Sequence, residues 1–97
     1  MVYKIAIIGA TGVVGRTVLQ IMFERNLLSH DIHIFAKNRE RRKKVVVGKR
    51  KFVVESLDEK TSQQKFDFAL FCTREDVSKR YVKRFAQNGT QVVDFSS

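Results

Sequence analysis

The feature that most constrains this chain is the stretch GATGVVG at residues 9–15, which lies between a short apolar run and a helical pattern. In a strand–turn–helix setting, Gly9 permits a sharp turn, Gly12 lets a pyrophosphate approach the backbone, and Gly15 lets the helix pack closely on a sheet. Free N–H groups and the helix dipole at such a helix start attract an anion. The glycine spacing differs from the more common G-x-G-x-x-G pattern, so a tight turn that binds nothing is the alternative interpretation.

The rest of the chain alternates between short apolar runs and helical patterns. Spacing and β-propensity predict a helix over 13–25, a second helix between Thr73 and Asn88, a weakly helical segment over 56–65, and strands over 3–8, 32–36, 45–47, 51–54, 66–72 and 91–95. Gly48 and Lys49 are expected to form the turn of a hairpin between the third and fourth strands.

This alternation predicts an α/β fold, a Rossmann-like, doubly wound and mostly parallel sheet with flanking helices. In the first helix, the apolar residues that we expect to face the sheet are Val14, Val18, Ile21 and Met22. In the second helix, the expected apolar face consists of Val77, Tyr81, Val82 and Phe85. The length of 97 residues fits one domain, residues 1–97, and is too short for a cofactor domain plus a substrate domain.

The end of the second strand bears on the choice of cofactor. A domain that binds NAD usually has Asp or Glu there to accept hydrogen bonds from the ribose 2′-hydroxyl. This chain instead reads Ala36-Lys37-Asn38-Arg39, and a guanidinium can hold a 2′-phosphate. The pattern favours NADP over NAD, although the adjacent Glu40 argues against it and a solvated basic loop is the alternative.

Positive charge is concentrated in one segment. Residues 37–51 contain nine of the 19 Lys and Arg residues and a single acid, in a chain with a formal net charge of +9. Such a patch attracts polyanions, among them nucleic acid, a phosphorylated cofactor or an acidic partner. We expect nucleic acid to be the less favoured partner, because only Phe52 could stack on bases and alternation places it inward.

Other site types are disfavoured. The single cysteine, Cys72, cannot form an internal disulfide, and we expect it to be a small buried hydrophobe. His30 and His33 have no convincing partners for a metal site. No apolar run reaches the roughly 18 residues of a membrane span, and no signal peptide is evident, so we expect a cytoplasmic protein without membrane association.

Five motifs in order resemble the N-terminal half of aspartate-semialdehyde dehydrogenases. They are GATGVVG at 9–15, Phe35-Ala36-x-x-Arg39 followed by Lys43-Lys44, Phe68-Ala69-Leu70-Phe71, Val77-Ser78-Lys79 and Asp94-x-Ser96-Ser97. The resemblance implies an oxidoreductase that interconverts aspartyl phosphate and aspartate semialdehyde with NADP, in amino-acid biosynthesis. It also implies that Thr11, Gly12, Val13 and Val14 hold the pyrophosphate, with Gly9 and Gly15 shaping the loop. Arg39 and Glu40 would face the 2′-phosphate, and Cys72 and Thr73 would lie beside the cofactor.

Departures from that family limit the expected activity. A Ser-Ala-Gly-Gly loop near the cofactor reads Cys72-Thr73-Arg74-Glu75 here, and Phe95 replaces a usual Asn. By resemblance, the catalytic cysteine and histidine lie beyond Ser97, so we expect no catalytic residue in this chain and no turnover by it alone. A non-catalytic NADP-binding protein and a basic nucleic-acid-binding module are the alternatives. We also expect apolar surface that a missing C-terminal domain or a homo-oligomer would cover.

Overall fold

The computed structural model describes residues 1–9, 12–36, 44–73 and 75–95. The elements, in chain order, are β1 (Lys4–Ile8), α1 (Val13–Glu24), a 3-10 turn η1 (Leu27–Ser29), β2 (Asp31–Ala36), β3 (Lys44–Val47), β4 (Arg50–Ser56), α2 (Glu59–Ser62), β5 (Phe68–Phe71), α3 (Glu75–Gln87) and β6 (Gln91–Asp94). The order expected from the sequence is confirmed. The 3-10 turn is an addition that the apolar spacing did not indicate.

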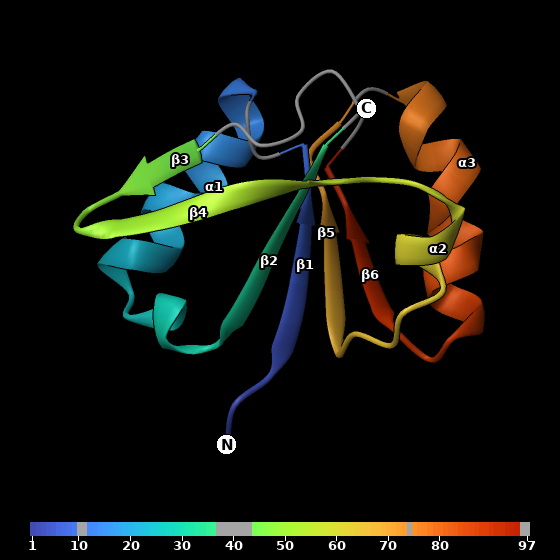
Figure 1. Cartoon of the computed structure of the whole chain (residues 1–97), viewed down its shortest axis with the longest axis horizontal. Helices are drawn as coiled ribbons and strands as arrows, with labels where there is room; N and C mark the ends of the chain where they lie inside the picture. Colours follow the sequence, from blue (N-terminus) through green and yellow to red (C-terminus); the bar gives the residue numbers. More distant parts are fainter. Residues whose placement is uncertain (10–11, 37–43, 74, 96–97) are drawn as a thin grey trace.

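The strands form one six-stranded sheet in the order β3-β4-β2-β1-β5-β6 (Figure 1). All neighbouring strands are parallel except β3 and β4, which form the predicted antiparallel hairpin. Gly48 adopts a left-handed φ of 60° in the hairpin turn. The ring of Phe23, from the end of α1, lies so close to Gly48 that an added Cβ would be 2.4 Å from it. The hairpin turn therefore packs against the C-terminal end of α1.

Successive strand residues point to opposite faces, so the sheet has two separate cores. The face covered by α1, here called the α1 face, is mostly aliphatic; its buried residues are Ile5, Ile7, Leu19, Met22, Leu28, Ile34, Ala36, Val45, Val47, Phe52, Val54 and Cys72. The opposite α3 face is rich in rings; its buried residues are Ala6, Ile8, Phe35, Leu57, Phe66, Ala69, Phe71, Tyr81 and Phe85. In Figure 1, α1 lies behind the hairpin at one end of the sheet, and α3 lies beside β6 at the other.

The predicted sheet-facing side of α1 is partly wrong. Of the four predicted residues, Met22 is buried and Val18 is partly buried against the core, whereas Val14 and Ile21 are each 46% exposed; Gly15 and Leu19 are buried instead. The two stripes have the same i, i+4, i+7 spacing and differ by one position, or about 100° of rotation. Because Gly15 has no side chain, the stripe that contains it can approach the sheet most closely. Local periodicity does not distinguish the two stripes.

The segment between β4 and β5 contains only one helical turn, α2. Asp58 and Thr61 cap it reciprocally: the Thr61 N–H donates to Asp58 Oδ1 (2.8 Å), and the Asp58 N–H donates to Thr61 Oγ1 (2.9 Å). An ion pair between Glu59 and Arg84 joins α2 to α3. In α3, Tyr81 and Phe85 are buried as predicted. None of the described helices has the length and apolar character needed to cross a membrane.

Candidate functional site: the carboxyl ends of β1 and β5

The chain leaves β1 through a glycine in an unusual conformation. Gly9 has a φ of 86°, in the left-handed region, and its N–H donates to the carbonyl of Phe35 at 2.8 Å. A Cβ added to Gly9 would lie 2.4 Å from Thr73 Cγ2 and 2.9 Å from the carbonyl oxygen of Cys72. The sharp turn predicted at Gly9 is confirmed, and the structure supplies a second reason for it. The loop after β1 is in contact with the loop after β5.

The helix that follows begins without a side-chain cap. Gly12 is the N-cap residue of α1, in an extended conformation, and it carries no side chain that could accept a hydrogen bond. Its carbonyl accepts the first helical bond, from the Arg16 N–H at 3.0 Å. The N–H groups of Val13, Val14 and Gly15 therefore have no intrahelical acceptor. The first turn contains no acidic side chain, so no carboxylate of that turn competes for these amides.

The described contacts give no internal reason for a glycine at position 12. Its φ of −86° suits any residue, and an added Cβ would meet only the Gly9 carbonyl oxygen, at 3.7 Å, an ordinary contact. The described surroundings of that Cβ are otherwise open. Gly15, by contrast, is buried in α1. Gly12 thus has open space around its backbone, whereas Gly15 is enclosed.

Beside Gly9 lie Cys72 and Thr73, which follow β5. The Cys72 N–H donates to the Ile8 carbonyl at 2.8 Å, so the two strand ends are level. The Cys72 side chain is buried in the core of the α1 face. Burial, and secondarily the negative charge of Asp94, raise the pKa of the thiol from 9.0 to about 11. At neutral pH this group is a protonated thiol and a poor nucleophile, in agreement with the sequence prediction.

The position of these groups in the sheet is that of a ligand site. β1 is followed by α1 on one face, whereas its parallel neighbour β5 is followed by α3 on the other, and the strand order runs outward in opposite directions from this pair. In open α/β sheets, ligands bind beyond the carboxyl ends of the strands at such a switch point. The described groups can bind an anion by main-chain hydrogen bonds and by the dipole of α1.

Three predicted cofactor residues, Thr11, Arg39 and Glu40, lie outside the described residues, as do Arg74 and the final two serines. β2 ends at Ala36, whose carbonyl accepts a hydrogen bond from the Leu57 N–H at 2.8 Å. The described end of β2 carries no carboxylate, which leaves the expected preference for a 2′-phosphate as a prediction.

The sequence reasoning missed one polar cluster, around His33. Its Nε2 lies 2.9 Å from Asp31 Oδ1, and its Nδ1 lies 3.2 Å from Glu55 Oε2. Alternation along β2 places Asp31 and His33 on the same face, but Glu55 comes from β4, and only the strand order shows that it is adjacent. His30 is separate, and its Nδ1 accepts the Tyr3 N–H at 3.1 Å. Within the described part of the chain, no three His, Cys, Asp or Glu residues are placed to hold a metal ion.

Comparison with known proteins agrees with this description. The family model "Semialdehyde dehydrogenase, NAD binding domain" matches residues 4–97. The chain is 36% identical over 97 residues to an aspartate-semialdehyde dehydrogenase of Aquifex aeolicus, and 38% identical over 95 residues to one of Rickettsia bellii. These matches cover 100% and 98% of this chain but only 28% of each relative. The solved aspartate semialdehyde dehydrogenase II of Vibrio cholerae superposes with a TM-score of 0.88 at 28% identity, covering all of this chain and 31% of that one.

Proposed function

Because the chain belongs to the family of semialdehyde dehydrogenase NAD-binding domains, we propose that it binds NADP as the cofactor part of an aspartate-semialdehyde dehydrogenase. The complete reaction would be the reductive dephosphorylation of aspartyl phosphate to aspartate semialdehyde, in the cytoplasm. The chain spans 28% of the length of the relatives that it matches, and we assign the chemistry of the acyl group to the regions of those relatives outside the match.

The observation that carries the proposal is the open start of α1. Its free amides, its dipole and the absence of a Cβ at Gly12 suit a pyrophosphate, the group common to NAD and NADP. When bound, the cofactor would supply a hydride through its nicotinamide ring. The residues of this chain would hold and orient it: Val13, Val14 and Gly15 through their amides, and Thr11 in the same loop.

The nicotinamide end of the cofactor would lie towards the end of β5. Cys72 and Thr73 follow that strand, and the carbonyl of Cys72 lies against Gly9. A thioester-forming nucleophile needs an accessible thiolate, whereas the raised pKa of Cys72 keeps its thiol protonated. We therefore assign Cys72 a structural and cofactor-positioning role and no covalent one.

The adenosine end would extend over β2, where we propose that Arg39 binds the 2′-phosphate with Glu40 beside it. The test is a titration of the chain with NADPH and NADH, followed by protein-observed NMR. A guanidinium–phosphate pair contributes about 1.5–3 kcal/mol, so NADPH should bind roughly tenfold or more tightly than NADH. The strongest shifts should fall on the amides of residues 12–15.

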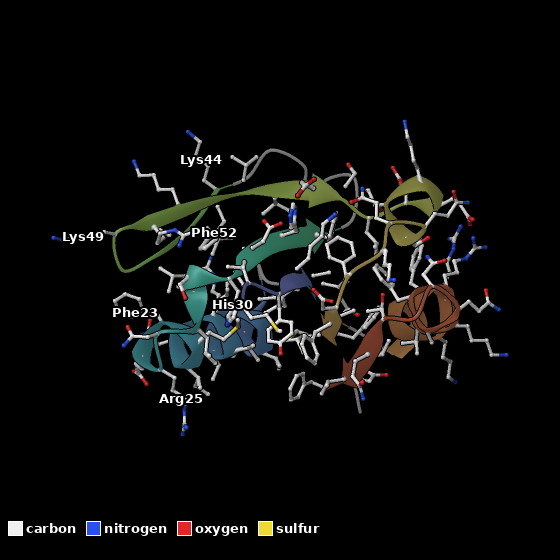
Figure 2. All side chains as sticks on the ribbon, turned by 90° about the horizontal axis from the view of Figure 1, so that it is seen from below. Phe23, Arg25, His30, Lys44, Lys49 and Phe52 are labelled. Carbon is white, nitrogen blue, oxygen red and sulfur yellow. The ribbon has the colours of Figure 1, made fainter. Side chains whose placement is uncertain are left out.

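Arg39→Ala should abolish the preference for NADPH while leaving NADH binding unchanged. The matched control is Arg25→Ala, which removes an exposed arginine at the C-terminal end of α1, away from Gly12 (Figure 2). A preference for NADPH that survives Arg39→Ala would refute the role of that residue. Indifference of the whole chain to both dinucleotides would refute the proposed function.

A non-catalytic NADP-binding protein is the second candidate, favoured by the Arg74-Glu75 sequence in place of two glycines. Both candidates predict the same titration result. They differ in the gene sequence after Ser97, where an enzyme requires an open reading frame with a cysteine nucleophile.

A further inference from the structure

The hairpin of β3 and β4 presents a basic surface that the proposed cofactor site does not use. The register pairs Lys44 with Val53 and Val46 with Lys51, and these four residues form what we call the outer hairpin face. All four are exposed, with Val46 at 60% and Val53 at 55%. The opposite side of the hairpin packs on α1, and its residues are Val45, Val47, Phe52 and Val54.

The charges on this surface are of one sign. Residues 44–54 include four Lys or Arg residues and no acid. Lys44 and Lys51 lie on adjacent strands, diagonal to each other on the same face, and Lys49 is in the turn. Figure 2 shows Lys44 and Lys49 directed away from the body of the molecule. Diagonal neighbours in a sheet are about 7–8 Å apart, so their like charges repel until an anion binds between or above them.

Arg50 is not part of this surface. Its Nη1 donates to the Leu28 carbonyl at 2.7 Å, and its guanidinium lies 5.0 Å from the centre of the Phe52 ring. Arg50 therefore anchors the hairpin to η1 on the inner side, which leaves lysines as the outward cations. The nearest acid along β4, Glu55, lies beside His33 at the end of the hairpin that joins β2.

The side chains on this face restrict the kind of polyanion. Phe52 is buried, so the face has no ring on which the bases of a single strand could stack. Its remaining side chains are lysine and valine, which provide point charges and small apolar contacts and no amide or guanidinium to read base edges. Val46 and Val53 are too small to anchor the hairpin in a lipid bilayer, a role usually taken by Trp, Phe or Leu.

We propose that the outer hairpin face binds the phosphate backbone of duplex nucleic acid, without sequence preference. The two strands lie about 5 Å apart, so the lysines form a compact group of cations that can contact the phosphates bordering a groove from outside. This surface is on the far side of the hairpin from α1. The inference is therefore independent of the proposed cofactor site.

The test measures binding of the whole chain to a fluorescent mixed-sequence DNA duplex of about 20 base pairs, by anisotropy at roughly 50 and 200 mM salt. The variant is Lys44→Glu with Lys51→Glu. The matched control is Lys60→Glu with Lys83→Glu, which changes the net charge equally at two exposed lysines of α2 and α3. Circular dichroism establishes that each variant is folded, and Lys44→Gln with Lys51→Gln is the milder substitute if the first variant is not.

We expect the wild-type chain to bind the duplex and to lose affinity steeply with salt. The hairpin variant should bind at least about tenfold more weakly at low salt, with the slope of log K against log salt reduced by about 2, whereas the control should stay within roughly threefold. Equal losses in both variants would overturn the proposal, because net charge alone would then explain binding. It would also be overturned if the wild type ignored the duplex, or if anionic vesicles and not the duplex bound to the outer hairpin face.

Discussion

The two faces of the sheet differ in their side chains and in how completely those side chains are buried. The α3 face is closed by interlocking rings: Phe85 lies 6.0 Å from Phe66 and 5.6 Å from Phe71, centre to centre. The α1 face is mostly aliphatic and includes the helix start that has no side-chain cap. At the β5–β6 end of the α1 face, Phe68 and Leu70 are partly buried, and Val93 and Phe95 are exposed.

This difference indicates that the two faces have different roles. Rings in edge-to-face contact bury large areas and hold α3 and β5 together, so the α3 face contributes mainly stability. The α1 face includes the start of α1, which has no side-chain cap, and the exposed apolar residues Val93 and Phe95. Substitutions on the α3 face should therefore change folding, and those at the edge of the α1 face should change binding and association.

The largest effect is expected from Phe85→Ala. This side chain is fully buried, and removing a buried ring costs about 3–5 kcal/mol, a large part of the stability of a small domain. Urea unfolding followed by circular dichroism would measure the loss. Phe95→Ala removes an equal ring from the exposed part of the α1 face and should cost less than about 1 kcal/mol. Similar losses for the two variants would contradict the comparison of the faces.

Gly9→Ala should have the next largest effect, about 2–3 kcal/mol, because it adds steric overlap to an unfavourable φ. The control is Gly89→Ala, where φ is 83° but nothing lies within 4 Å of an added Cβ. Gly89→Ala therefore measures the cost of the φ angle alone. Thermal or urea unfolding of both variants should show Gly9→Ala to be the more destabilising; equal losses would mean that the contact with Cys72 and Thr73 is unimportant.

A smaller, pH-dependent effect is expected from Cys72. Its pKa in the folded chain, about 11, is above the ordinary value of 9.0, so the buried thiol contributes stability below pH 9. That contribution is lost as the pH rises from about 9 towards 11, by at most about 2–3 kcal/mol. Unfolding experiments across this range should give a steeper decline for the wild type than for Cys72→Ala. Parallel curves for the two proteins would show that the thiol is not protected by folding.

The smallest effect on stability should come from Val93→Ser with Phe95→Ser, which should instead change association. We propose that the exposed apolar residues at the β5–β6 end of the α1 face, Val93 and Phe95, drive the isolated chain to self-associate. Sedimentation velocity should show concentration-dependent association of the wild type and less of it in this variant. Val46→Ser with Val53→Ser removes two apolar residues from the hairpin that are still more exposed, at 60% and 55% against 40% and 46%, and is the control. A wild type that remains a strict monomer would refute the proposal.

Much of the fold could be predicted because its signals are local. The order of strands and helices follows from residue periodicity, and the Gly48 turn follows from the glycine between two valine-rich runs. The glycine loop after β1 could be predicted for the same reason, since Gly9, Gly12 and Gly15 lie within one strand–turn–helix unit. The buried face of α1 could not, because two adjacent stripes have the same spacing and only the approach of the sheet selects between them.

The sequence by itself determined the element order, the glycine loop that opens α1, the basic character of the hairpin and the inward position of Phe52. Only the tertiary structure decided that Gly9 touches Thr73, that Glu55 lies beside His33, and that lysines alone face outward on the hairpin. The physical reason is the separation along the sequence of the residues involved. Turns and periodicity depend on neighbouring residues, whereas these contacts depend on the strand order β3-β4-β2-β1-β5-β6. That order is selected by burial of the whole sheet and is not encoded in any one segment.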